Sequence, residues 1–273
     1  MSCAAVMVYV DADGTPERRV RLSATLADKF NATLIGLSAI AIRPPMMVKG
    51  FAMDRATEAE VAALSTKLAD KGSWFHNIAR AEHRKLEWRP VFDFPGNAVA
   101  REARSADLIV IGQMSGPGDT YSSLEPGDAV LRIGRAALIV PDSATSLRAQ
   151  RVVIGWKDCR EARRAVQDAL PFLGDATRVT ITEICRSGEE EAARNHLDDV
   201  ALYLTRHRIN AGPKVIIQQE GSGAAQLIKL AEDEGADLIV TGAYGHGRLG
   251  EWIFGGMTND LLATSPICCF MSN

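Results

Sequence analysis

The stretch ADLIVIG, residues 106–112, returns as ADLIVTG at residues 236–242, with six of the seven positions identical. Each copy is a short apolar run between an aspartate and a glycine, which favours a buried strand of a parallel sheet. Repetition of a whole strand motif over this distance predicts two related domains in tandem. We place them at residues 1–145 and 150–273, because the small, polar run 142–146 is typical of a linker.

Outward from the second copy, apolar runs alternate with helical patterns. The expected order is strand 151–156, helix 160–173, strand 177–184, helix 189–208, strand 214–219, helix 223–235, strand 237–242, helix 257–264 and strand 266–271. This alternation predicts an α/β fold with βαβ units and parallel sheets. The β-branched run 214–217 is typical of a strand covered on both faces. The first copy follows the same order but inserts a longer helical stretch around residues 55–85.

Composition excludes several classes of protein. The 273 residues include 31 Lys and Arg against 34 Asp and Glu, a net charge of −3, so net charge does not favour a nucleic-acid surface. Apolar runs such as residues 4–10 fall far short of the roughly 20 residues that a membrane span needs. The start has no charged region before an apolar segment, and the five cysteines lack paired CxxC spacing. We therefore expect a cytoplasmic protein without a structural metal site.

A glycine-rich loop follows the second copy of the motif. Six glycines stand at positions 242, 245, 247, 250, 255 and 256, between the strand and a helical pattern that holds Thr258. Glycine lets the backbone approach an anion closely, and the N–H groups at a helix start point outward, so the loop could cradle a phosphate. The alternative from the residues alone is that the glycines serve tight turns and close packing.

At this loop the sequence resembles the universal stress protein family. Its nucleotide-binding members carry a glycine, two residues, a glycine, nine residues, a glycine, and then Ser or Thr. Gly242, Gly245 and Gly255 fall on the three glycine positions, whereas Gly256 stands where a hydroxyl residue is expected. The resemblance extends over both halves. It implies two tandem Rossmann-like domains of the adenine nucleotide alpha hydrolase-like type, each a five-stranded parallel sheet with helices on both faces, packed like the dimer of single-domain members.

The resemblance also implies a set of binding residues for an adenine nucleotide (ATP, ADP or AMP). It places Asp158 near the ribose, Ile184 near the adenine, Gly242, Tyr244 and Gly245 along the ribose and phosphates, and Gly255, Gly256 and Thr258 at the phosphate tail. Because Gly256 has no hydroxyl, AMP or ADP should fit better than ATP, and whether Mg²⁺ accompanies the nucleotide is left open. From the residues alone, Asp158 and Thr258 could equally cap helices, Tyr244 could be a loop aromatic and Ile184 a core residue.

The first half departs from this pattern. Gly112 is present, but residues 113–118 do not reproduce the second and third glycines, and Pro126 and Ala129 lie near the positions that match Gly255 and Thr258. We expect this half to bind no nucleotide in the family's manner and to serve as a packing partner. Pairing of the two halves within one chain leaves a further homodimer open.

Two other functions compete with a nucleotide-binding stress-response or signalling protein. The run Asp11-Ala12-Asp13-Gly14-Thr15 after an apolar strand resembles the first motif of haloacid-dehalogenase phosphatases, with Asp11 as nucleophile and Asp13 as general acid. Its companion motifs are absent from the sequence, and an Asp-rich turn before a helix is the simpler interpretation. The other alternative is a nucleotide-free interaction module. No base is positioned beside the glycine loop, so we expect no catalytic residues and at most slow ATP hydrolysis.

Overall fold

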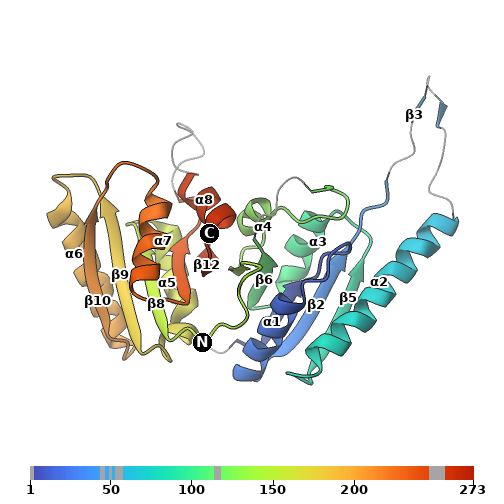
Figure 1. Ribbon diagram of the computed structural model, residues 1–273, viewed down its shortest axis with the longest axis horizontal. Helices are drawn as coiled ribbons and strands as arrows, with labels where there is room; N and C mark the ends of the chain where they lie inside the picture. Colours follow the sequence, from blue (N-terminus) through green and yellow to red (C-terminus); the bar gives the residue numbers. More distant parts are fainter. Residues whose placement is uncertain (1–2, 44–46, 49–50, 53–57, 114–117, 246–255) are drawn as a thin grey trace.

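Both copies of the repeated motif form central strands of one continuous sheet. The computed structural model describes residues 3–43, 47–48, 51–52, 58–113, 118–245 and 256–273. The elements of the first half are β1 (Ala5–Tyr9), α1 (Glu17–Lys29), β2 (Thr33–Ala39), β3 (Met47–Val48), β4 (Phe51–Ala52), α2 (Glu58–Ala79), β5 (Leu86–Val91), α3 (Pro95–Glu102), the 3-10 helix η1 (Ala103–Ser105), β6 (Leu108–Gly112), α4 (Pro126–Arg132) and β7 (Ala136–Val140). Figure 1 shows these elements on one side of the molecule.

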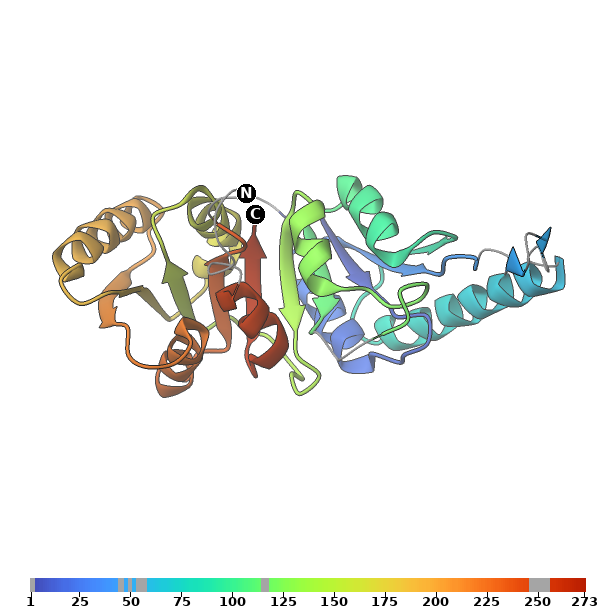
Figure 2. The same ribbon diagram turned by 90° about the horizontal axis from the view of Figure 1, so that it is seen from above.

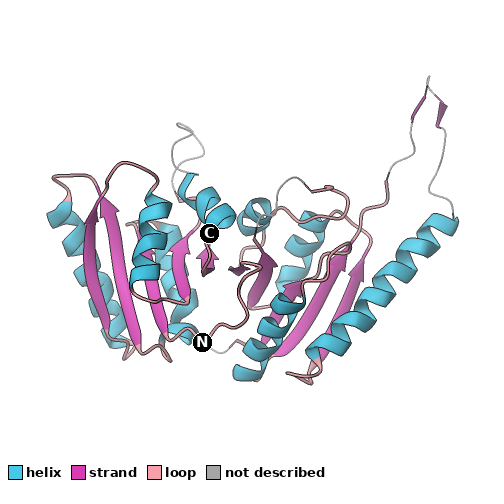
Figure 3. Cartoon of the chain, viewed as in Figure 1, coloured by secondary structure: helices cyan, strands magenta, loops and turns pink. Residues whose placement is uncertain are grey.

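The second half repeats the order without the β3–β4 excursion. Its elements are β8 (Arg151–Trp156), α5 (Arg160–Leu173), β9 (Arg178–Cys185), α6 (Glu190–Arg206), β10 (Ala211–Ile217), α7 (Gly223–Asp233), β11 (Leu238–Gly242), α8 (Gly256–Thr264) and β12 (Cys268–Ser272). Every expected element of this half is present within a few residues of its predicted bounds. Figure 3 shows the alternation of strands and helices in both halves.

Ten strands form the sheet in the order β10-β9-β8-β11-β12-β7-β6-β1-β2-β5. Neighbouring strands within each half are parallel, which confirms two five-stranded parallel sheets. The halves join where β12 pairs antiparallel with β7, with Phe270 opposite Leu138. Figure 2 shows these two strands side by side at the middle of the molecule. The pairing within one chain that the resemblance implied is therefore present.

The aspartate that opens each repeated motif explains why the motif recurs. The Asp107 carboxylate accepts hydrogen bonds from the N–H groups of Ala4 and Ala5 at 2.7 and 3.0 Å. In the second half, the Asp237 carboxylate accepts from Arg148 and Ala149 at 3.0 and 2.8 Å. Charge-assisted bonds of this kind hold the segment that enters the first strand of each half against the motif strand.

Two apolar cores lie on opposite faces of the sheet, because alternate residues of each strand point to opposite sides. Helices α1, α2, α5 and α6 cover one core, and helices α3, α4, α7 and α8 cover the other. Both cores run across the junction: Phe30 of the first half meets Phe172 edge to face, with ring centroids 5.2 Å apart, and Phe172 in turn meets Phe270 at 5.5 Å. Helices on both faces, as the fold class required, are confirmed.

The run 214–217 differs from its expectation. We expected a strand covered on both faces, but β10 is an edge strand, Lys214 is exposed and Ile217 is 46% exposed. The strand also begins at Ala211 and includes Pro213. A proline cannot donate to a neighbouring strand and is tolerated at an edge. The opposite edge strand, β5, likewise contains Pro90.

Membrane crossing was tested on the helices directly. Among the residues that the structure describes, none of the helices combines the length and the apolar character of a membrane span.

Replacing Phe270 by Ala tests the shared core. Phe270 is 1% exposed and lies at the junction, opposite strand β7 of the other half. Its truncation should therefore lower the free energy of unfolding by about 3–5 kcal/mol. The measurement is urea denaturation followed by circular dichroism and by tryptophan fluorescence. Leu202→Ala, at a 51% exposed side chain, is the control and should change stability by about 0.5 kcal/mol or less. Equal effects of the two changes would contradict the assigned core.

Candidate functional site

The glycine loop leaves β11 at the carboxyl edge of the second sheet, where open α/β sheets bind ligands. Tyr244 has a positive φ of 55°, and its N–H donates to Thr258 Oγ1 at 3.2 Å. Thr258 lies in the first turn of α8 and is buried. Its hydroxyl therefore ties the start of the loop to the helix that follows, which brings Gly242, Tyr244, Gly245 and Thr258 together.

Gly242 is required by packing. A Cβ at this position would lie 2.6 Å from the backbone nitrogen of Ala162 and 2.7 Å from the carbonyl carbon of Glu161. The end of β11 thus touches the backbone at the start of α5. This contact supports the packing interpretation of Gly242, because only a residue without a side chain lets the strand and helix approach so closely.

Gly245 faces a carboxylate. A Cβ at Gly245 would lie 2.9 Å from Glu161 Oε2 and 3.0 Å from Cys159 Sγ. Glu161 is 8% exposed, and its Oε1 pairs with Arg160 Nη2 at 3.0 Å. Burial pushes the pKa of Glu161 up, but hydrogen bonds from its own backbone N–H and from Cys159, together with Arg160, outweigh burial and hold that pKa below its usual range. A negative charge therefore lies beside Gly245, at the start of the glycine loop.

Three more predicted residues lie around this loop. Asp158 follows β8 and pairs with Arg163 at 2.5 Å, so its carboxylate is already engaged with the first turns of α5. Ile184 is half-buried near the end of β9 and lies opposite Ile216 in the edge strand. Gly256 opens α8, and no described heavy atom lies within 4 Å of the Cβ that it lacks. Gly255 lies outside the described residues.

Tyr244 reaches toward the first half. Its hydroxyl donates to Asn259 Oδ1 at 2.8 Å and would lie 2.5 Å from a Cβ on Gly127 of α4. Burial, followed by the nearby charges of Glu125 and Asp128, raises the pKa of Tyr244. The side chain is thus part of the contact between the two halves, which agrees with the interpretation of Tyr244 as a loop aromatic.

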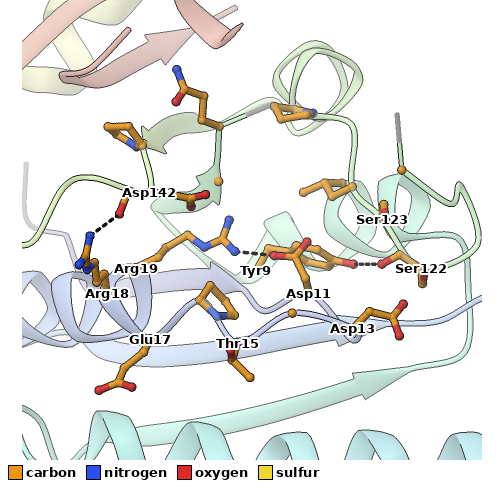
Figure 4. A pocket seen from close by; sticks show the side chains of 18 of the residues that line it. Tyr9, Asp11, Asp13, Thr15, Glu17, Arg18, Arg19, Ser122, Ser123 and Asp142 are labelled. Atoms are coloured by element: carbon orange, nitrogen blue, oxygen red, sulfur yellow. Dashed lines mark hydrogen bonds and ion pairs between the residues drawn. The ribbon is translucent and has the colours of Figure 1, made fainter. Parts of the chain in front are cut away.

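The first half holds a cavity with a volume of about 1020 Å³. Figure 4 shows it at the carboxyl end of β1, between the start of α1 and the segment that leads into α4. At its centre Arg19 Nη2 pairs with Asp11 Oδ2 at 2.5 Å. Arg19 is 9% exposed, and its Nε has no hydrogen-bond partner among the residues described.

The Asp11–Asp13 pair gains no support as a phosphatase centre. Each carboxylate is held by a cation, Asp11 by Arg19 and Asp13 by Lys67. The Lys67 hydrogen bond, with others, lowers the pKa of Asp13, whereas a general acid must hold a proton. Within the described ranges, moreover, no three His, Cys, Asp or Glu side chains gather to hold a metal ion.

Arg19 and Glu161 are the site residues that sequence reasoning missed. Each is the buried charged residue in the first turn of the helix that follows the first strand of its half. A buried charge that breaks the apolar stripe of a helix is the signal that could have found them, since charged residues are almost never buried without a partner. The two halves thus place opposite charges beside equivalent strands.

Three comparisons with known proteins bear on the chain. The model of the universal stress protein family matches residues 148–271. No curated protein matches the sequence. A universal stress protein from Archaeoglobus fulgidus aligns with 98% of this chain and 96% of its own, with a TM-score of 0.75 and 15% identity. A putative universal stress protein from Pseudomonas aeruginosa aligns with 99% and 93%, with a TM-score of 0.62 and 11% identity. These solved structures show that the whole chain has their fold.

The packing role of Gly242 can be tested against Gly256. Gly242→Ala should lower the free energy of unfolding by about 1–3 kcal/mol, because the new methyl group meets backbone atoms that cannot move aside. Gly256→Ala, at an open helix start, should change it by about 0.5 kcal/mol or less. Chemical denaturation of both variants decides the point, and a harmless Gly242→Ala would refute the close contact.

Proposed function

We propose that the second domain, in which residues 148–271 match the universal stress protein family, binds an adenine nucleotide at the Gly242–Gly245 loop, while the first domain repeats the same fold. The observation that carries this proposal is the geometry at the start of α8. No described heavy atom lies within 4 Å of the Cβ that Gly256 lacks, while Thr258 holds the strand end of the loop against the same helix turn. Backbone N–H groups at such a helix start are suited to a phosphate.

The proposed binding set is the one that the glycine motif indicates, and it is supported by residues near the carboxyl ends of β8, β9 and β11 and at the start of α8. The backbone at Gly245 and Gly256 approaches the phosphates, Asp158 and Ile184 lie toward the ribose and adenine, and Thr258 keeps the loop in place. Gly255 belongs to the set by its position in the motif alone. Without a hydroxyl at position 256 and with Glu161 beside Gly245, the site favours AMP or ADP over ATP.

The wider role in this proposal is that of a nucleotide-responsive stress or signalling protein. We keep the domain boundaries 1–145 and 150–273 and a cytoplasmic location, which suits the five free cysteines. The first domain acts as the packing partner of the nucleotide-binding one, through β7 and β12. Nucleotide hydrolysis is at most slow, and the protein responds to the nucleotide by binding it.

Isothermal titration of the full chain with AMP, ADP and ATP tests the proposal. Wild-type protein should bind ADP, and Gly245→Val should abolish binding, because a branched side chain would stand where the phosphates approach. Gly212→Val, the same change at an exposed glycine of the edge strand β10 where no described heavy atom lies within 4 Å of the missing Cβ, is the control and should retain binding. Binding by a folded Gly245→Val protein with unchanged affinity, or no binding by the wild type, would count against the loop.

Removing the charge of Glu161 gives a second test. Glu161→Gln keeps the side-chain shape and takes away a negative charge beside Gly245, so ADP should bind about tenfold more tightly. Adenosine, which has no phosphate, should bind the two proteins equally. If ADP affinity falls, or if adenosine gains as much as ADP, then the phosphates do not lie beside this carboxylate.

A further inference from the structure

The cavity of the first domain is separate from the proposed nucleotide site and is built from other elements. Its walls come from the turn after β1, the first turns of α1, the segment 118–126 and the segment 141–145. A volume of about 1020 Å³ is enough for a metabolite of sugar size with water around it. The glycine pattern of the second domain is absent from its loops, so a ligand here needs other chemistry.

Arg19 supplies that chemistry. Its side chain is 10% exposed and makes one ion pair, between Nη2 and a single oxygen of Asp11. A guanidinium carries five N–H donors, and Nε has no acceptor among the described residues although it is buried. A buried donor left without an acceptor costs about 1–3 kcal/mol. An oxyanion in the cavity would accept hydrogen bonds from those N–H groups of Arg19 that reach the lining.

Gly112 makes room for the guanidinium. A Cβ at Gly112 would lie 1.9 Å from Arg19 Nη1 and 2.9 Å from its Cζ. The equivalent glycine of the second domain, Gly242, instead lies against the backbone of α5. The same position of the repeat therefore packs against the guanidinium of an arginine in one domain and against the start of a helix in the other.

Most carboxylates around the cavity are already neutralised. Asp11 pairs with Arg19, Asp13 with Lys67 and Glu17 with Arg21. Arg18 also lines the cavity, and its Nη1 donates to the carbonyl oxygen of Asp142 at 3.1 Å, an uncharged acceptor that leaves its positive charge available. The lining of the cavity therefore has a second cation in addition to Arg19.

Hydroxyl side chains make up much of the remaining lining. Thr15, Thr120, Ser122 and Ser123 line the cavity, as do two further carboxylates, Glu125 and Asp142. In Figure 4 the Tyr9 hydroxyl points to Ser122, whose carbonyl oxygen it reaches at 3.4 Å. Carboxylates in the lining disfavour a ligand that is anionic at every end, whereas they accept hydrogen bonds from ligand hydroxyls.

We propose that this cavity is a second binding site, for a polyhydroxylated metabolite that carries one oxyanion, with Arg19 binding the oxyanion. A sugar phosphate and a sugar acid share this chemistry. The site is separate from the nucleotide loop, because every described residue of its lining belongs to the first domain. A chain with both sites can respond to an adenine nucleotide and to a sugar-type metabolite.

Titration of the full chain with D-glucose 6-phosphate, D-glucuronate and D-glucose tests this site and distinguishes the two oxyanions. The wild type should bind at least one of the two anions, and neutral glucose about tenfold or more weakly. Arg19→Gln should weaken binding of that anion about tenfold or more. Arg101→Gln, at a 44% exposed arginine outside the cavity lining, is the matched control and should leave it unchanged.

A second variant guards against misfolding of Arg19→Gln. Gly112→Ala displaces the flexible end of Arg19 and leaves the guanidinium in the protein. The variant should therefore keep the fold and also bind the anion more weakly. ADP binding should be unchanged in both variants, which separates this site from the nucleotide loop. Absence of anion binding up to about 10 mM, equal binding of glucose, or anion binding that neither variant weakens would overturn the proposal.

Discussion

The antiparallel pairing of β7 with β12 is the interaction on which the rest of the molecule depends. It turns two five-stranded sheets into one sheet of ten strands and brings α4 and α8 into contact above the junction. Gln113 Nε2 donates across it to the Ser265 carbonyl oxygen at 3.0 Å, and Tyr244 reaches across it toward Gly127. The start of the glycine loop is therefore supported by the first domain as well as by its own. A domain without the glycine pattern thus contributes to the shape of the glycine loop in the other.

The two domains share a scaffold and differ in the charge that faces their ligand edge. In both, the repeated strand ends in a glycine, and a charged side chain from the helix that follows the first strand of the domain lies beside that glycine. That side chain is Arg19 in the first domain and Glu161 in the second. Because a buried charge acts through a low effective dielectric, one such exchange changes which ligands an edge can accept. This difference underlies the separate ligand chemistry that we propose for the two domains.

Much of the fold could be predicted from the sequence, because its determinants are local. Apolar runs with aspartate and glycine at their ends located β6 and β11, and the helical pattern 223–235 located α7, whose first turn donates from Ala224 N–H to the Ser222 hydroxyl. The edge position of β10 could not be predicted, because it depends on which strands pair. The roles of Arg19 and Glu161 were equally hidden, since both lie among the charged residues typical of a helix start and only the tertiary packing buries them. The binding roles of the glycine-loop residues remain predictions.

The most direct test of the account is a crystal structure of the full chain grown with ADP. We predict density for the nucleotide at the carboxyl edge of the second sheet, with its phosphates beside Gly245 and the start of α8, and none for it beside Arg19. A nucleotide bound only in the first-domain cavity would contradict the assignment of the two sites. So would an empty second domain whose loop is filled by its own side chains.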